Sequence, residues 1–356
     1  MKVLIVGAGV AGPTLAYWLQ QAGHQPTLVE RASALRRGGY LVDFWGAGFD
    51  VAERMGIVPE LRRHGYVMAE ARTVGSDGRV IASLKPSAIM GPTERYVSIA
   101  RADLAAAIFG ALEGGAELIL DDTVCALDDD GGRVRVTFAS GQCREFDLVV
   151  GADGLHSQVR RLVFGPDEEF ERYQNMVVAV FDVTGYRPRD ELVAMMYAER
   201  GFQAVRVSLR NDVTMVIFTV RHDAAVPLDN VGAQQALLRE RLSGAGWETQ
   251  ALLEAMPRAE TFYFDAVSQI QMPAWTRGRV ALVGDAAACP SLLAGQGSAL
   301  AMVESYVLAA ELAQADRAHE HAFARYQARL APSSTPSRPP PGGWRWRSRR
   351  ALGSSS

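Results

Sequence analysis

The chain has 356 residues, 48% of them hydrophobic, and a formal net charge of −3. This size can bury a sizeable core in two lobes, and the weak charge argues against a nucleic-acid partner. No apolar run is long enough for a membrane span, no export signal opens the chain, and three scattered cysteines (Cys125, Cys143 and Cys289) argue against disulfides and metal sites, so we expect a cytoplasmic protein.

The first predicted elements form a dinucleotide-binding unit. A buried strand over 2–6 runs into Gly7-Ala8-Gly9-Val10-Ala11-Gly12, and a helix is predicted over 13–22. Gly7 permits a tight turn, Gly9 lets backbone approach a pyrophosphate, and Gly12 lets the helix pack on the strand. A second strand ends in Glu30, where a carboxylate would accept hydrogen bonds from an adenosine ribose. The pattern favours FAD or NAD over NADP; the alternative is a strand–turn–helix that binds nothing.

Alternating strands and helices follow this unit. A helix is predicted over 101–113, and a buried strand over 146–150 leads into Gly151-Ala152-Asp153-Gly154. Such alternation favours a largely parallel sheet. Taken alone, the second glycine segment is a turn, but its place after a buried strand favours a functional role. Further short strands are predicted over 117–120, 123–127 and 134–138.

Residues 174–270 change character. They hold five strand-like runs and only two helical segments, at 232–242 and 249–256, which predicts a mainly antiparallel sheet inserted into the nucleotide-binding body. The chain then returns with a buried strand over 280–283, Gly284-Asp285, and a long helix over 298–315. The five runs are 175–181, 192–197, 204–209, 214–220 and 261–270.

Three glycine and acid segments in this order resemble the class A FAD-dependent aromatic monooxygenases, the family of para-hydroxybenzoate hydroxylase. The resemblance covers about residues 1–330, and the segment 289–302 is most similar to the branch of tetracycline-modifying enzymes. It rests on Gly7 to Gly12, on Gly151 to Ser157 with Arg160, and on Gly284-Asp285-Ala286-Ala287 with Gly295-Gln296-Gly297.

The resemblance implies an α/β fold: a Rossmann-like FAD-binding domain of the glutathione reductase type with an inserted, mainly antiparallel β-sheet substrate domain. We expect residues 1–67, 95–170 and 272–330 to form the FAD-binding domain, and residues 68–94 and 171–271 to form the substrate-binding domain. There is no second nucleotide fold for NAD(P)H, which the family binds transiently. The sequence does not indicate an oligomeric state.

The same resemblance implies the chemistry. NAD(P)H would reduce FAD, and a flavin C4a-hydroperoxide formed with O2 would hydroxylate an aromatic or polycyclic small molecule. One alternative is an FAD-dependent reductase or dehydrogenase of a hydrophobic substrate. Another is a catalytically silent homologue that binds a flavin or another ligand.

Site residues follow from the matched motifs. Asp285 is expected at the ribityl and pyrophosphate groups, Arg101 at phosphate or ribityl oxygens, and Arg31 at the adenine. Pro290, Gly295 and Gly297 are expected beside the flavin ring, where the helix N-terminus faces the charge near N1 of reduced flavin. Plain alternatives are a helix cap for Asp285, a solvated residue for Arg101, and a surface pair for Arg160 and Arg161. The predicted cofactor set is Gly7, Gly9, Ala11, Gly12, Glu30, Arg31, Arg101, Asp153, Asp285, Gly295, Gln296 and Gly297.

Substrate contacts are expected from two places. The glycine-containing loop 38–46 offers Tyr40 and Phe44, and the inserted strands offer Tyr197, Arg206 and Phe218; the alternative for the strand residues is plain core. His156 is either a proton-relay or nicotinamide contact or, as we favour, a surface histidine. Further strand candidates are Met176, Phe181, Met196 and Phe264.

The segment 331–356 is compositionally distinct and is expected to be disordered. It holds five arginines and no acidic residue, with Pro, Ser and Gly making up much of the rest. One interpretation is a basic tail that contacts an acidic partner or membrane surface. We favour the other, a shift of reading frame in a GC-rich gene. Because coherent sequence stops near Leu330 where many relatives continue, the alignment of flavin and substrate is in question.

Overall fold

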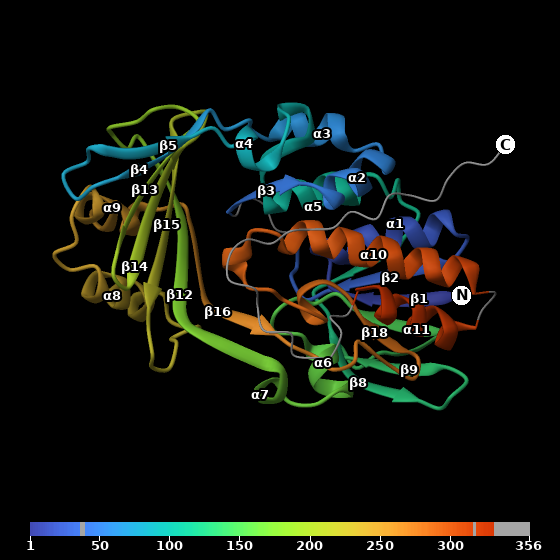
Figure 1. The fold of residues 1–356 in the computed structure, drawn as a ribbon. Helices are drawn as coiled ribbons and strands as arrows, with labels where there is room; N and C mark the ends of the chain where they lie inside the picture. Colours follow the sequence, from blue (N-terminus) through green and yellow to red (C-terminus); the bar gives the residue numbers. More distant parts are fainter. Residues whose placement is uncertain (36–39, 316–317, 331–356) are drawn as a thin grey trace.

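The computed structural model describes residues 1–35, 40–315 and 318–330. The predicted tail, and Gly38 and Gly39 of the predicted loop, lie outside these residues. Figure 1 shows two lobes, with the parallel sheet and its helices in one and a large antiparallel sheet in the other. The predicted α/β class is therefore confirmed.

A six-stranded sheet organises the first lobe. Its order is β17-β18-β11-β1-β2-β7, parallel throughout except for the antiparallel β17–β18 edge. β1 is apolar on both faces, as a covered parallel strand requires. The strands are β1 (Lys2–Val6), β2 (Gln25–Glu30), β7 (Glu117–Leu120), β11 (Leu148–Gly151), β17 (Thr276–Arg277) and β18 (Val280–Leu282).

Helices and a small sheet cover this parallel sheet from two sides. In Figure 1, α1 and α10 lie above it, and α6, β8 and β9 lie below it. Ser305 Oγ of α10 donates to the Ala11 carbonyl at the start of α1 over 3.0 Å, which fixes the two helices together. The remaining elements here are α1 (Ala11–Gln21), α2 (Ala47–Arg54), α3 (Val58–His64), α5 (Arg101–Gly110), α6 (Gln158–Val163), α7 (Asp167–Phe170), α10 (Gly297–Gln314), α11 (His319–Leu330), β3 (Leu41–Trp45), β6 (Tyr96–Ala100), β8 (Val124–Asp129), β9 (Val134–Phe138) and β10 (Cys143–Phe146).

A seven-stranded sheet organises the second lobe, in the order β16-β12-β15-β14-β13-β4-β5. All neighbours are antiparallel except β13 and β4. Its two edges differ, because β16 lies beside the first lobe while β5 is exposed along its whole length. The elements are β4 (Glu70–Val74), β5 (Val80–Leu84), α4 (Ser87–Met90), β12 (Glu171–Thr184), β13 (Val193–Glu199), β14 (Phe202–Ser208), β15 (Val213–Arg221), α8 (Val231–Arg241), α9 (Thr249–Ala255) and β16 (Thr261–Ile270).

Both faces of this second sheet are apolar, but they pack against different partners. One face, with Phe181, Val216 and Phe218, packs under α8 and α9. The other, with Val178, Val180 and Met215, packs toward Tyr40 and Leu292 of the first lobe. We call these the helix face and the inner face. Alternation along each strand assigns every strand residue to one of them.

Candidate active site

The β1–α1 loop has the close backbone packing that its glycines predict. Gly7 has φ +106°, and a Cβ there would lie 2.5 Å from the Ala152 carbonyl oxygen. A Cβ at Gly12 would lie 1.9 Å from the Gly7 carbonyl oxygen, so helix and strand meet only because Gly12 has none. At Gly9 a Cβ would meet Arg101 Nη2 at an ordinary 3.7 Å. The first and third glycines therefore serve packing, whereas a Cβ at the second would meet only the Arg101 guanidinium within 4 Å.

Glu30 ends β2 beside this loop. Its Oε2 accepts from the Ala8 amide at 2.9 Å and its Oε1 from the Ala32 amide at 3.0 Å. Each oxygen keeps a second lone pair, which suits ribose hydroxyl donors. Arg31 is exposed next to it.

Three segments distant in sequence meet at the carboxyl ends of β1, β11 and β18. The Gly284 amide donates to Glu304 Oε2 of α10 at 2.6 Å, and a Cβ at Gly284 would lie 3.2 Å from Ala11 Cβ. Burial raises the pKa of Glu304 well above its ordinary value. The first and last glycine segments thus share one packed junction.

Asp285 and Arg101 face each other across this junction. Burial raises the pKa of Asp285, and the Arg101 guanidinium opposes that shift. The Arg101 amide donates to the Tyr40 carbonyl at 3.1 Å, which holds Tyr40 in the same cluster. Burial beside Asp285 raises the pKa of the Cys289 thiol to about 12, so the thiol stays protonated. The two simpler interpretations were a solvated side chain for Arg101 and a helix cap for Asp285. In the structure Arg101 is half-buried, and Asp285 caps neither neighbouring helix.

The start of α10 lies against the same cluster. Gly295 has φ +64°, and a Cβ at Gly297 would lie 3.5 Å from Asp285 Oδ1. Gln296 is the N-cap and makes no side-chain capping bond, so the first amides of α10 stay open to an anion. Gln269 of β16 donates to the Pro290 carbonyl at 3.0 Å and joins this loop to the second lobe.

The second glycine segment is held by the side chain of Asp153. Asp153 accepts from Ser157 Oγ at 2.5 Å and from the Gln158 and Val159 amides at 2.7 and 3.0 Å. Asp153 therefore caps the N-terminus of α6 and positions the loop that packs on Gly7, and its contact with the cofactor stays a prediction.

Arg160 is fully buried and is not a surface residue. It donates to the Leu155 carbonyl at 2.6 Å and the Ala286 carbonyl at 3.2 Å, and it pairs with Asp167 at 2.7 Å. It thereby fastens the second glycine segment to the third. Arg161 is exposed and pairs with the same Asp167.

The predicted substrate residues separate into two groups. Tyr40 lies on the inner-face side, with its ring centroid 5.2 Å from that of Tyr263. Phe44 is fully buried in the first lobe and packs on Phe49. Tyr197, Arg206 and Phe218 lie on the helix face: Phe218 packs under α8 and α9, Arg206 pairs with Glu248 at 2.9 Å, and Tyr197 contacts Trp247.

Tyr197, Arg206 and Phe218 therefore lie on the face opposite the first lobe, and Phe44 lies in the first lobe's core; their roles as substrate contacts stay predictions. Of the further candidates, Phe181 and Phe264 share the helix face, whereas Met176 and Met196 lie on the inner face. The sequence analysis missed Tyr263 and Asp265, which lie beside Tyr40. Alternation along 261–270 separates Tyr263 and Asp265 from Phe262 and Phe264, but the pattern did not tell which of the two faces looks toward the first lobe.

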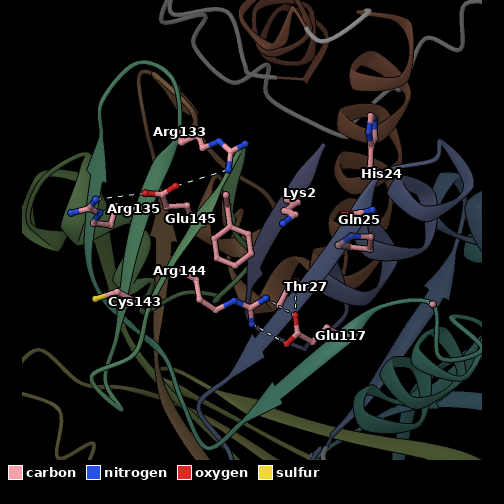
Figure 2. Close-up of a pocket in the computed structure, with 13 residues that line it drawn as sticks. Lys2, His24, Gln25, Thr27, Glu117, Arg133, Arg135, Cys143, Arg144 and Glu145 are labelled. Carbon is pink, nitrogen blue, oxygen red and sulfur yellow. Dashed lines mark hydrogen bonds and ion pairs between the residues drawn. The ribbon is translucent and has the colours of Figure 1, made fainter.

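A groove of about 800 Å³ lies at the other end of the parallel sheet (Figure 2). It is bounded by the amino ends of β1, β2 and β7 and by β9 and β10. Arg144 donates to Glu117 at 2.7 and 2.9 Å, and Arg133 and Arg135 face Glu145, so these arginines are paired with carboxylates of the groove. Ligands of such sheets bind at the carboxyl ends, which places the cofactor site away from this groove.

Within residues 1–35, 40–315 and 318–330, no helix has the length and hydropathy that crossing a bilayer requires. Over the same residues, no three His, Cys, Asp or Glu side chains are grouped to hold a metal ion.

Known proteins resemble this chain over most of its length. A family model described as an FAD binding domain matches residues 1–335. A protein of Mycobacterium tuberculosis, described as uncharacterized, is 40% identical over 333 residues, covering 92% of this chain and 89% of that one. A flavin-dependent monooxygenase of Legionella longbeachae is 32% identical, covering 93% and 85%. The crystal structure of tetracycline destructase Tet(55) has a TM-score of 0.82 at 34% identity, covering 92% and 84%.

The fold and the junction of glycine loops define a dinucleotide-binding flavoprotein. More specifically, the chain belongs to the FAD-binding-domain family of flavin-dependent monooxygenases, and it is an enzyme with FAD as cofactor.

Proposed function

We propose that this chain consumes NAD(P)H and O2 to hydroxylate an aromatic or polycyclic small molecule. The observation that carries this proposal is the position of the inner face. The apolar and aromatic side of the second sheet packs toward Tyr40 and Leu292, next to the junction formed by Gly9, Asp285 and the start of α10. A flat hydrophobic substrate would lie between them.

The residues at the junction fit FAD. Gly9 and the N-terminus of α1 would hold the pyrophosphate, Glu30 the ribose, and Arg101 and Asp285 the ribityl chain. The open amides at the start of α10 would face the flavin ring, where negative charge develops on reduction. FAD supplies the redox chemistry and oxygen activation. Pro290, Gly295 and Gly297 stay predictions as residues beside the ring, and Arg31 as the adenine contact.

The inner face would bind the substrate and exclude water. Its members are mostly Met, Val and Ile, which adapt to a large apolar ligand, and Tyr40 and Tyr263 supply aromatic rings near the junction. The described strand residues on this side are Met176, Val178, Val180, Ala194, Met196, Val205, Val207, Val213, Met215, Ile217, Tyr263 and Val267. Similarity to a tetracycline destructase at 34% identity supports a polycyclic substrate.

The test starts with the purified protein, its visible spectrum and a panel of phenols and tetracyclines under NADPH. We expect bound FAD, reduction that is faster with one panel member, and an oxygen-dependent hydroxylated product. FAD that transfers hydride without an oxygenated product would instead indicate a reductase or dehydrogenase. FAD that never becomes reduced would indicate a silent binding protein, and either result would contradict the proposal.

A further inference from the structure

The groove at the amino ends of β1, β2 and β7 is a second concave site, separate from the cofactor junction (Figure 2). One wall comes from the parallel sheet, and the other comes from β9 and β10 of the small antiparallel sheet. Its volume of about 800 Å³ lies within the range of small-molecule sites. The lining side chains that carry a full charge at neutral pH are Lys2, Glu117, Arg133, Arg135, Arg144 and Glu145.

Positive charge exceeds negative charge in this groove. Four cations face two carboxylates, which leaves a surplus of two positive charges in a chain whose net charge is −3. The ring of Phe146 is buried and lies under the Arg144 guanidinium, so it offers little surface for stacking. The lining therefore favours an anion over an aromatic ring.

One of the four cations already has strong partners. Arg144 donates to both oxygens of Glu117, at 2.9 and 2.7 Å, and Thr27 Oγ1 donates to the same carboxylate at 3.1 Å. Such a two-pronged contact satisfies both the guanidinium and the carboxylate. The Arg144–Glu117 pair is therefore part of the wall, and it joins β10 to the edge strand β7 of the parallel sheet.

The other three cations keep their donors. Arg133 Nη1 lies 3.9 Å from Glu145 Oε2, and Arg135 Nη2 lies 3.6 Å from Glu145 Oε1, both too long for a hydrogen bond. Among the described residues, neither of these guanidinium groups makes a hydrogen bond, and the Lys2 ammonium has no partner. The side chains of Arg133 and Arg135 are 55% and 66% exposed, so a ligand in solution can reach them.

Glu145 is the single counterion of two guanidinium groups. It lies directly opposite Arg135 in the register of β9 and β10, and Figure 2 shows it between Arg133 and Arg135. One carboxylate balances one of the two charges, so an anion with two or more charges would be held more strongly than Glu145. Phosphate oxygens suit this position, because a guanidinium presents parallel N–H donors that match phosphate geometry.

We propose that this groove binds a compact polyphosphate group, either inorganic pyrophosphate or the phosphates of a nucleotide. Arg133, Arg135 and Lys2 would donate to the phosphate oxygens, and Glu145, which is 49% exposed, would turn from the guanidinium groups toward solvent. The inference goes beyond the proposed function and does not depend on it, since the described lining residues belong neither to the cofactor junction nor to the inner face.

Calorimetric titration of the FAD-loaded protein tests this site, because FAD then fills the place at the junction that would take a diphosphate. The probes are sodium pyrophosphate, ATP and sodium sulfate in metal-free buffer. Arg133→Gln and Arg135→Gln each remove one guanidinium, and Glu145→Gln removes the competing carboxylate. Arg221→Gln is the matched control, since Arg221 is 68% exposed and lies 3.4 Å from Asp223 on the second lobe.

We expect pyrophosphate to bind at least about tenfold more tightly than sulfate, because the site is built for more than one phosphate. Arg133→Gln and Arg135→Gln should each weaken pyrophosphate binding about tenfold, whereas Glu145→Gln should strengthen it about threefold. Arg221→Gln should leave it unchanged. The four variants should melt near the wild-type temperature, because each altered side chain is about half exposed or more.

ATP distinguishes the two sources of the phosphates: binding as tight as that of pyrophosphate or tighter indicates a nucleotide, and weaker binding indicates pyrophosphate itself. Failure of both to bind, or equal binding of sulfate, would overturn the proposal. So would an affinity that is unchanged in Arg133→Gln and Arg135→Gln, or one that does not rise in Glu145→Gln. The titration uses no NADPH, oxygen or substrate, so its failure and the failure of the proposed function are separate results.

Discussion

The cofactor junction and the inner face are built on different principles. At the junction, backbone meets backbone: a Cβ at Gly12 would lie 1.9 Å from the Gly7 carbonyl oxygen, and one at Gly7 would lie 2.5 Å from that of Ala152. The inner face is a sheet surface on which side chains of several sizes pack toward the first lobe. The glycines of the junction therefore tolerate almost no substitution. The inner face, by contrast, can change its residues and thereby the substrate that it accepts.

The largest effect should come from placing a methyl group at the junction. We expect Gly12→Ala to destabilise the protein by about 3 kcal/mol or more and to abolish FAD binding, since backbone must move to admit the Cβ. Gly9→Ala is the matched control: its Cβ has room, so the apoprotein should unfold at nearly the wild-type temperature while its affinity for FAD falls. Thermal unfolding and FAD titration measure both. Equal stability of the two variants would refute the assignment of these glycines.

The next largest effect should come from removing Arg160, which joins the second glycine segment to the third. Arg160→Ala leaves the Asp167 carboxylate and two carbonyls without their buried donor, which we expect to cost about 3 to 5 kcal/mol of unfolding free energy. Arg161→Ala removes an exposed partner of the same Asp167 and should stay within about 0.5 kcal/mol. Denaturant unfolding compares them, and a similar loss in both would show that burial of Arg160 does not matter.

Substitutions at two adjacent residues of β15 test the different roles of the helix face and the inner face. Phe218→Leu lies under α8 and α9 and should lower stability by about 1 kcal/mol without altering KM for a substrate. Ile217→Ala lies on the inner face and should change KM as well as stability. Steady-state kinetics with the best panel substrate decides the point. A KM change in Phe218→Leu alone would reverse the assignment of faces.

The smallest effect concerns the ion pair between His156 of the first lobe and Asp265 of β16. The pKa of His156 should fall in Asp265→Asn, because the neutral amide no longer favours the imidazolium, and NMR titration of the ring protons measures it. Since folding raises this pKa, the pair's stabilisation is present below the unfolded-state pKa and is lost as pH rises through the folded-state pKa. An unshifted pKa of His156 in the wild-type protein would contradict the contact of 3.3 Å between His156 Nε2 and Asp265 Oδ1.

The sequence predicted the backbone shape of the junction because its requirements are local, while the cofactor contacts of these residues stay predictions. A strand, three glycines at fixed spacing and Glu30 at the end of the next strand specify a backbone shape, and Asp285 follows a buried strand in the same way. Asp153 shows the limit of such reasoning: it lies in the expected loop, but its oxygens serve α6. Spacing places a residue without telling which donor reaches it.

The inward face of the second sheet could not be predicted, because alternation gives two faces without identifying the one that looks toward the first lobe. On β15, Ile217 and Phe218 are equally apolar in sequence, and only α8 and α9, packed over Phe218, distinguish them. Arg206 was a candidate substrate contact, yet its ion pair with Glu248 lies on the helix face. Tertiary packing decides these roles.

The central claim is oxygen transfer by bound FAD, and isotopic labelling tests it most directly. Turnover of the best panel substrate with NADPH under ¹⁸O₂ should give a product that carries one ¹⁸O atom, detected by mass spectrometry, and the unlabelled product should form under ¹⁶O₂ with H₂¹⁸O. A product without the label from ¹⁸O₂, or NADPH oxidation that yields no oxygenated product with any panel member, would contradict the account.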